Sequence, residues 1–304
     1  MSAAAYGIPL ALVTTSAFNT GLILEKHALT KMSALNLRKT GHAIVSLLSS
    51  PAWLSGFALM LTGVACQVVV LTFEPISLVQ PVLAAGVALT LVLSRLVLRE
   101  RLGGAESWCV AVLAVALVLL AFSQDASARN TAQAPGTMIM MAAVLPSVAA
   151  GLLISLRPRR GPTGRHASAA TGTGISSGIG IGLLYGVGAL MTKGLSGILG
   201  RHQSAVSIGL GILSSPYLYL LAGCSAAALL LYQAALQACR ASILIPVTNV
   251  ASSVYFVIAG TWLFHEQLPA SPVRLGLRLA GIAAAGLVIV FLSRQGPPRA
   301  AADP

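Results

Sequence analysis

The chain has 304 residues, of which 56% are hydrophobic and only 9% are charged, and its mean hydropathy is +0.87. An ordinary soluble domain carries about 25% charged residues, so this composition excludes a water-soluble globular protein. The formal net charge of +12 does not indicate nucleic acid as a partner, because no soluble segment interleaves basic residues with aromatic ones.

Apolar segments recur along the chain at close to the roughly 20 residues that a helix needs to cross the hydrocarbon core of a membrane. They are continuously apolar rather than alternating, which favours bundled helices over a β-barrel. No charged residue precedes the first segment, so we expect it to be retained as a span rather than cleaved as a signal peptide. The sequence therefore predicts an all-α polytopic membrane protein with nine transmembrane helices, at residues 6–24, 51–73, 76–98, 107–122, 136–156, 174–195, 216–236, 242–264 and 275–292.

The basic residues divide unequally between the two sides of this arrangement. Of the 19 Lys and Arg residues, 14 fall on one side and five on the other, namely Arg129, Lys193, Arg201, Arg274 and Arg278. The positive-inside rule places the richer side in the cytoplasm. We therefore expect an integral protein of a bacterial plasma membrane, with the N-terminus outside and the C-terminus in the cytoplasm. Membrane lipids are expected partners, since the basic loop at residues 157–165 could contact anionic head groups.

The chain also contains an internal repeat. Leu48-Ser49-Ser50-Pro51 returns as Leu213-Ser214-Ser215-Pro216, and four further matches follow in the same order at offsets of 165 to 167 residues: Lys26 with Lys193, Gln67 with Gln233, Ser77–Pro81 with Ser242–Pro246, and Glu100 with Glu266. An odd fifth span separates the two copies, so they enter the membrane from opposite sides. The predicted organisation is a first repeat at 1–127, a linking span and basic loop at 128–170, an inverted second repeat at 171–293, and a short disordered tail at 294–304.

Inverted repeats of this kind place a substrate site near the membrane midplane at their interface, often beside interrupted helices. Pro81 and Pro246 occupy matched positions inside the third and eighth predicted helices. Each removes a backbone donor where water cannot replace it. We interpret them as hinges, with a tolerated kink as the alternative.

Polar side chains inside membrane spans are costly and usually face the interior of the bundle, so they are candidates for binding a substrate. Hydrogen bonding between helices is the alternative role for each of them. The pair Gln67 and Gln233 stands out because the repeat places both residues near its pseudo-twofold axis. The candidates are Asn19, Gln67, Gln80, Tyr185, Tyr232, Gln233, Thr248, Asn249 and Tyr255.

Four charged residues beside the spans are candidates for a gate or for coupling to an ion. Lys26 and Lys193 occupy matched positions and could pair with an anionic substrate, although snorkelling to the membrane surface explains them as well. Glu25 and Glu74 are the only carboxylates that adjoin the first three predicted spans. They could couple transport to a proton or a cation, but we expect them to be solvated in loops.

Other features indicate packing rather than chemistry. Gly174, Gly178, Gly182 and Gly186 recur every four residues and predict close contact with another helix. The four cysteines lie in or at the ends of spans, which argues against a disulfide framework. The five histidines are scattered over loops, without the spacing of a metal site. We therefore assign no catalytic residue, no metal site and no cofactor.

These residues resemble the EamA-type unit of the drug/metabolite transporter superfamily. The resemblance covers nearly the whole chain and lies in the small-rich first span that ends near Lys26, the segment Pro75–Pro81 that enters the third span, and the Glu-x-Leu exits at Glu100 and Glu266. The nine-span layout and the sequence Thr20-Gly21-Leu22-Ile23-Leu24-Glu25-Lys26 are most similar to the NIPA branch, whose members are described as magnesium transporters.

The resemblance implies a secondary transporter rather than an enzyme. We expect it to move a small polar solute by alternating access of the two repeats. One alternative is a NIPA-like transporter of magnesium or another divalent cation, and a second is a flippase for a lipid-linked head group. A membrane assembly factor without transport activity is a third. Assembly as a homodimer is left open.

Overall fold

A computed structural model of the chain describes residues 4–33, 35, 40–73, 86–90, 92–99, 104–123, 137–156, 167–199, 210–211, 213–264 and 271–294. Within these ranges every long regular element is a helix, so the prediction of an all-α membrane protein is confirmed. Predictions for Glu74, Gln80 and Pro81 lie outside the described residues, and so does the proposed tail from residue 295 onward, whereas Arg294, its first predicted residue, is still helical.

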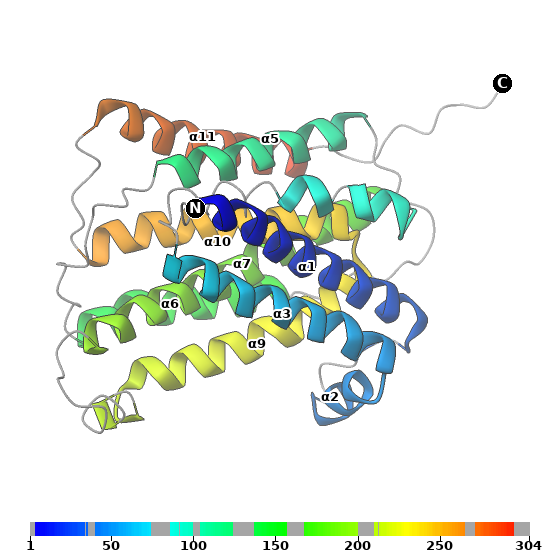
Figure 1. Ribbon diagram of the computed structural model, residues 1–304, viewed down its shortest axis with the longest axis horizontal. Coiled ribbons are helices and arrows are strands. Elements are labelled where there is room, and N and C mark those ends of the chain that lie inside the picture. The colour runs from blue at the N-terminus through cyan, green and yellow to red at the C-terminus, as the bar shows by residue number, and fades with distance from the viewer. Residues whose placement is uncertain are drawn as a thin grey trace.

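Most of the helices lie side by side in one bundle (Figure 1). Helices α11 and α5 lie along one edge of the view and α9 along the opposite edge, while the short α2 lies at the end of α3 and packs Leu47 into the buried cluster around Trp53. The helices are α1 (Ala4–Lys31), α2 (Thr40–Leu48), α3 (Pro51–Phe73), α5 (Gly104–Phe122), α6 (Thr137–Leu156), α7 (Ala167–Leu199), α9 (Pro216–Ala238), α10 (Ala241–Leu263) and α11 (Pro272–Arg294).

The helix lengths suit a membrane. Five helices of the described chain are long and apolar enough to cross one, and the bent pair of α2 and α3 raises that number to six. Shorter apolar helices run over Gly86–Leu96 and Ser107–Phe122, within the third and fourth predicted spans. Large apolar side chains such as Trp108, Trp262 and Met138 are exposed on the outside of the bundle. Lipid is the solvent that suits such a surface.

The repeated Ser-Pro sequence starts two helices in the same way. The Ser50 hydroxyl accepts a hydrogen bond from the Trp53 amide at 3.3 Å, and the Ser215 hydroxyl accepts one from the Tyr217 amide at 3.2 Å. A serine N-cap satisfies a free amide of the first turn, and a proline at the first helical position removes another. Pro51 and Pro216 hold these first positions of α3 and α9. The inverted repeat itself stays a prediction.

Helix α2 was not predicted from the sequence. It buries Ala43 and Leu47 and exposes Ile44 and Val45, and its axis makes an angle of 85° with that of α3. The bend falls at Ser50-Pro51, because a residue before proline disfavours the α-helical conformation.

Glycines set the distances between neighbouring helices. A Cβ at Gly182 of α7 would lie 2.8 Å from the Thr248 carbonyl oxygen of α10, so the prediction that this glycine series packs closely on another helix is confirmed. Helices α1 and α3 are as close, because a Cβ at Gly56 would lie 2.7 Å from the Glu25 amide nitrogen. These contacts bring α1 and α3 together in one half of the chain, and α7 and α10 in the other.

Candidate functional site

Glu25 is the centre of the polar residues that the fold brings together. It lies on α1, which continues beyond the predicted boundary at residue 24 to Lys31, and its side chain is 0% exposed. The expectation of a solvated loop carboxylate was therefore wrong. The extra helical turns carry Glu25 against α3, whose glycine at position 56 admits it.

The two oxygens of the Glu25 carboxylate have different surroundings. Oε2 accepts a hydrogen bond from the Gln233 amide nitrogen at 2.5 Å, whereas Oε1 is buried without any hydrogen-bond partner. Gln233, which is also 0% exposed, lies on α9 in the second half of the chain. The carboxylate is therefore held on one side and open on the other.

Trp53 fixes the orientation of the Gln233 amide. Its indole Nε1 donates to the Gln233 oxygen Oε1 at 3.1 Å. An indole nitrogen can only donate, so the amide oxygen must face Trp53 and the amide nitrogen must face Glu25. Stacking on Phe57, with ring centroids 4.9 Å apart, holds the indole itself. Trp53, Gln233 and Glu25 thus form one directed chain of hydrogen bonds.

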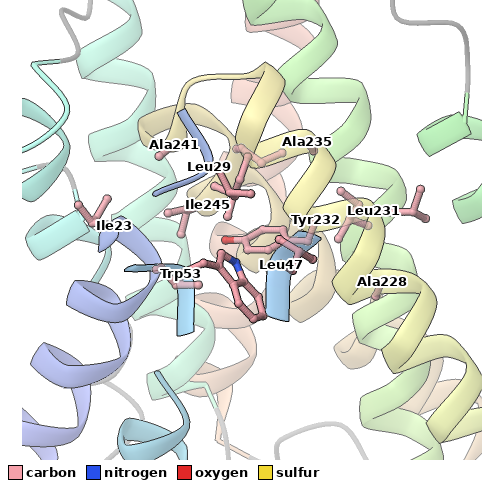
Figure 2. Close-up of a cluster of buried hydrophobic side chains, with 14 of the residues drawn as sticks. Ile23, Leu29, Leu47, Trp53, Ala228, Leu231, Tyr232, Ala235, Ala241 and Ile245 are labelled. Carbon is pink, nitrogen blue, oxygen red and sulfur yellow. The ribbon is translucent and has the colours of Figure 1, made fainter. Parts of the chain in front are cut away.

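Two tyrosines complete what we call the Glu25 cluster, namely Glu25, Trp53, Tyr185, Tyr232 and Gln233. The rings of Tyr185 and Tyr232 meet edge to face with centroids 6.1 Å apart, and both lie within electrostatic range of the carboxylate. Figure 2 shows Tyr232 and Trp53 in the midst of buried aliphatic side chains. Three of the predicted substrate-binding residues therefore gather around one of the predicted coupling residues.

Lys26 and Gln237 join the ends of α1 and α9 reciprocally. The Lys26 ammonium, 6% exposed, donates to the backbone carbonyls of Leu236 and Cys239, at 2.7 Å for the second. The Gln237 amide nitrogen in turn donates to the carbonyls of Leu29, Met32 and Ser33, at 3.0, 3.3 and 2.9 Å. Each side chain donates to carbonyls at the C-terminal end of the other helix, where backbone amides are too few to satisfy them all. Snorkelling was therefore the wrong interpretation of Lys26.

Sequence reasoning missed Trp53 and Gln237. A signal for Gln237 was present, because it follows Gln233 by four residues and so shares its face of α9. Nothing in the local pattern distinguishes Trp53 from an apolar packing residue.

Asn19 lies elsewhere on α1, and its side chain is hydrogen bonded at both ends of the amide. Its amide nitrogen donates to the Thr15 carbonyl at 2.8 Å, and its amide oxygen accepts from the Thr90 hydroxyl at 2.6 Å. This arrangement fits the alternative of hydrogen bonding between helices.

Three further predicted binding residues lie along α10. Thr248 is buried and its hydroxyl has no hydrogen-bond partner, Asn249 is half-buried, and Tyr255 is hydrogen bonded to Ser147 and packs on Gly186. Pro246 lies inside this helix, which runs unbroken from Ala241 to Leu263, and its role as a hinge stays a prediction.

Lys193, the counterpart of Lys26, is half-buried near the end of α7. Its ammonium lies over the ring of Phe264, 4.7 Å from the centroid. It therefore takes no part in the Glu25 cluster. Gln67 lies on α3, outside the residues whose side chains the structure describes.

The Glu25 cluster offers one carboxylate to a ligand. Among the described residues no three His, Cys, Asp or Glu side chains group together as they do in a closed metal site. An ionised oxygen in apolar surroundings is stabilised by a cation, a proton or water, and Oε1 has no protein partner to stabilise it. The open oxygen, with the amide of Gln233 beside it, suits an ion that keeps most of its bound water molecules.

Comparison with protein families gives one match over nearly the whole chain. Residues 2–295 match the family described as Magnesium transporter NIPA. No curated protein and no solved structure matches the chain.

Proposed function

Because the chain belongs to the NIPA magnesium transporter family, it is a membrane transporter, and we propose that it carries Mg²⁺ and that Glu25 contacts the ion or its water shell. The observation that carries this proposal is the fully buried Glu25 carboxylate with its unpartnered Oε1. Mg²⁺ gives up its waters reluctantly and is usually bound through one or two carboxylates. A single open carboxylate oxygen fits that preference.

The position of the cluster supports a role in alternating access. Glu25 and Trp53 belong to the N-terminal half of the chain, while Tyr185, Tyr232 and Gln233 belong to the C-terminal half. A movement of one half against the other would lengthen the hydrogen bond from Gln233 to Glu25 and change the access to Oε1. We propose that the two inverted repeats rock in this way, with the ion bound at their contact.

The orientation in the membrane forms part of the proposal. The unequal division of the 19 basic residues supports an N-terminus outside and a C-terminus in the cytoplasm. The Glu25 cluster then lies toward the cytoplasmic ends of α1 and α9, since Lys31 and Ala238 end these helices on the basic side.

Flux into proteoliposomes tests the proposed function. Purified protein is reconstituted around a Mg²⁺-sensitive dye, and Mg²⁺ uptake is compared with uptake of Ca²⁺ and of labelled neutral metabolites. We expect saturable Mg²⁺ uptake that falls about tenfold or more in Glu25→Gln, the range seen when a metal site loses a supporting group. Glu106→Gln, the same chemical change on α5, is the matched control and should transport normally.

Three outcomes would contradict all or part of the proposal. Metabolite uptake without Mg²⁺ uptake would establish a general solute transporter instead. Mg²⁺ uptake that is equal in the wild type and Glu25→Gln would retain the function and remove Glu25 from it. If neither the ions nor the metabolites are taken up, lipid-linked substrates should be tested next.

A further inference from the structure

A second group of buried charges lies at the other end of the bundle from the Glu25 cluster. It comprises Arg278 of α11, Lys193 near the end of α7, and Thr261 and Phe264 at the end of α10, and we call it the Arg278 site. Figure 1 shows the end of α10 and the start of α11 at the same end of the bundle. Helix α10 follows α9 after a link of two residues and runs back along the bundle, so its end is remote from Gln233.

Arg278 is a buried charged residue whose hydrogen-bond donors are not all used. Its side chain is only 8% exposed, and its Nε is buried with no hydrogen-bond partner. One terminal nitrogen donates to the Thr261 hydroxyl, at 3.3 Å, which is a long hydrogen bond to a neutral acceptor. A buried guanidinium is ordinarily paired with a negative group, because the loss of water is otherwise uncompensated. Glu25 is the one acidic side chain whose surroundings the structure describes, and it belongs to the other cluster.

Lys193 adds a second positive charge to the same place. Its ammonium covers the ring of Phe264, which is one turn beyond Thr261 on α10, and its charge interacts with that of Arg278. The two cations therefore flank the same face of the last turn of α10. Two positive charges at one place attract an anion more strongly than either charge does alone.

We propose that the Arg278 site binds an oxyanion of the phosphate class, held by the Arg278 guanidinium and the Lys193 ammonium. The free Nε–H and a terminal N–H of a guanidinium form a planar pair of donors that matches two oxygens of one phosphate. The phosphate can come from a phospholipid head group or from inorganic phosphate in solution. Arg278 lies about 9 Å along α11 from Pro272, a depth near the membrane surface that both sources can reach.

This site goes beyond the proposed cation transport and does not depend on it. It has the opposite charge and shares no residue with the Glu25 cluster, although Lys193 and Tyr185 both lie on α7. The proposed orientation places the Arg278 site toward the outer side of the membrane, where a bound oxyanion would cancel a positive field that otherwise opposes the approach of a cation.

Thermal unfolding of the purified protein in neutral detergent tests the site with two probes. One arm adds inorganic phosphate at constant ionic strength, and the other adds phosphatidylglycerol, with phosphatidylcholine at the same concentration as its control. We expect one of the two probes to raise the unfolding midpoint of the wild type by about 3 °C at saturation, and the probe that does so identifies the source. In Arg278→Gln the rise should vanish, while Arg95→Gln, which alters an exposed arginine, should respond as the wild type does.

The remaining variants keep the test decisive. If Arg278→Gln does not fold, Arg278→Lys replaces it, since lysine keeps the charge and loses the Nε donor, and its rise should be smaller than that of the wild type. Glu266 follows Phe264 by two residues in the sequence, so Glu266→Gln is included. A rise that appears only in Glu266→Gln would mean that this carboxylate already fills the site, and it would overturn the proposal. An equal rise in the wild type and the Arg278 variants, or no rise with either probe, would overturn it as well.

Discussion

The carboxylate of Glu25 is asymmetric, and this asymmetry is the smallest feature on which the account depends. One oxygen is bonded to Gln233 and the other has no partner, although both are buried. Trp53 produces the difference, because its N–H fixes which end of the Gln233 amide faces the carboxylate. Trp53 does not bond to the carboxylate itself. By orienting Gln233, it determines which oxygen of Glu25 stays open to a ligand.

Trp53→Phe should weaken Mg²⁺ transport without unfolding the protein. Phenylalanine retains the stacking on Phe57 but leaves the Gln233 oxygen without its donor. The loss of one hydrogen bond is worth about 1 kcal/mol, which corresponds to a rise in the KM for Mg²⁺ of roughly fivefold. Initial rates of Mg²⁺ uptake over a range of concentrations measure this change. An unchanged KM would mean that the amide needs no orienting donor.

Lys26→Met should destabilise the protein far more than Lys31→Met. Methionine keeps an unbranched chain that is one heavy atom shorter, but it leaves the carbonyls of Leu236 and Cys239 without the ammonium. Hydrogen bonds from a charged donor contribute about 1.5–3 kcal/mol each, so we expect a loss of roughly 3 kcal/mol in the free energy of unfolding. Lys31 is exposed in the last turn of the same helix and serves as the control. Equal unfolding midpoints of the two variants in detergent would refute the capping role.

At the scale of helices, glycine contacts decide how closely α1 approaches α3. Each helix supplies a glycine where the two backbones meet, since a Cβ at Gly21 would lie 2.7 Å from the Gly56 carbonyl oxygen. Side chains cannot relieve such contacts, because the opposing atoms belong to the backbone. The same packing places Glu25 against α3.

Gly56→Ala should therefore impair both stability and transport. The new methyl group would lie 2.7 Å from the Glu25 nitrogen and must separate the two helices. Such overpacking costs typically about 1–3 kcal/mol, and the shift of α1 should also reduce Mg²⁺ uptake. Gly223→Ala on α9 is the control, because its methyl group meets nothing within 4 Å. If both variants transport and unfold alike, close packing of α1 and α3 is not required.

The sequence predicted helices better than it predicted their ends. The starts of α3 and α9 are correct because a serine and a proline mark them locally. The end of α1 is wrong by seven residues, because Glu25 and Lys26 signal the end of an apolar span while their partners lie more than 200 residues away. Helix α2 was missed because it is too short to give a membrane signal.

At the scale of the whole molecule, the proposed orientation predicts which terminus a reagent can reach. Single cysteines are introduced as Ser2→Cys or Ala301→Cys after the four native cysteines have been replaced by alanine. A membrane-impermeant maleimide should label position 2 in intact cells and position 301 only after the cells are permeabilised. The reverse pattern would contradict the orientation inferred from the basic residues.

The candidate site was partly predictable from the sequence. The high cost of a polar group inside a membrane span led to the choice of Tyr185, Tyr232 and Gln233, which the structure brings together around Glu25. Their role in binding stays a prediction. They could not pair Gln233 with Glu25, since periodicity gives the face of a helix but not which helix packs against that face. The expectation that Gln67 and Gln233 both lie near the pseudo-twofold axis rests on the repeat alone and stays a prediction, since the side chain of Gln67 lies outside the described ones. Gln233 itself bonds to Glu25 and Trp53.

Contact between the ion and Glu25 is the central claim, and protection from chemical modification measures it most directly. A membrane-soluble carbodiimide, which attaches to carboxyl groups in apolar surroundings, is applied to the reconstituted protein with and without Mg²⁺, and the modified residues are identified by mass spectrometry. The account predicts that Mg²⁺ slows the modification of Glu25 in a saturable way and leaves any modification of Glu106 unchanged. Modification of Glu25 at the same rate with and without Mg²⁺, in protein that still transports Mg²⁺, would contradict it.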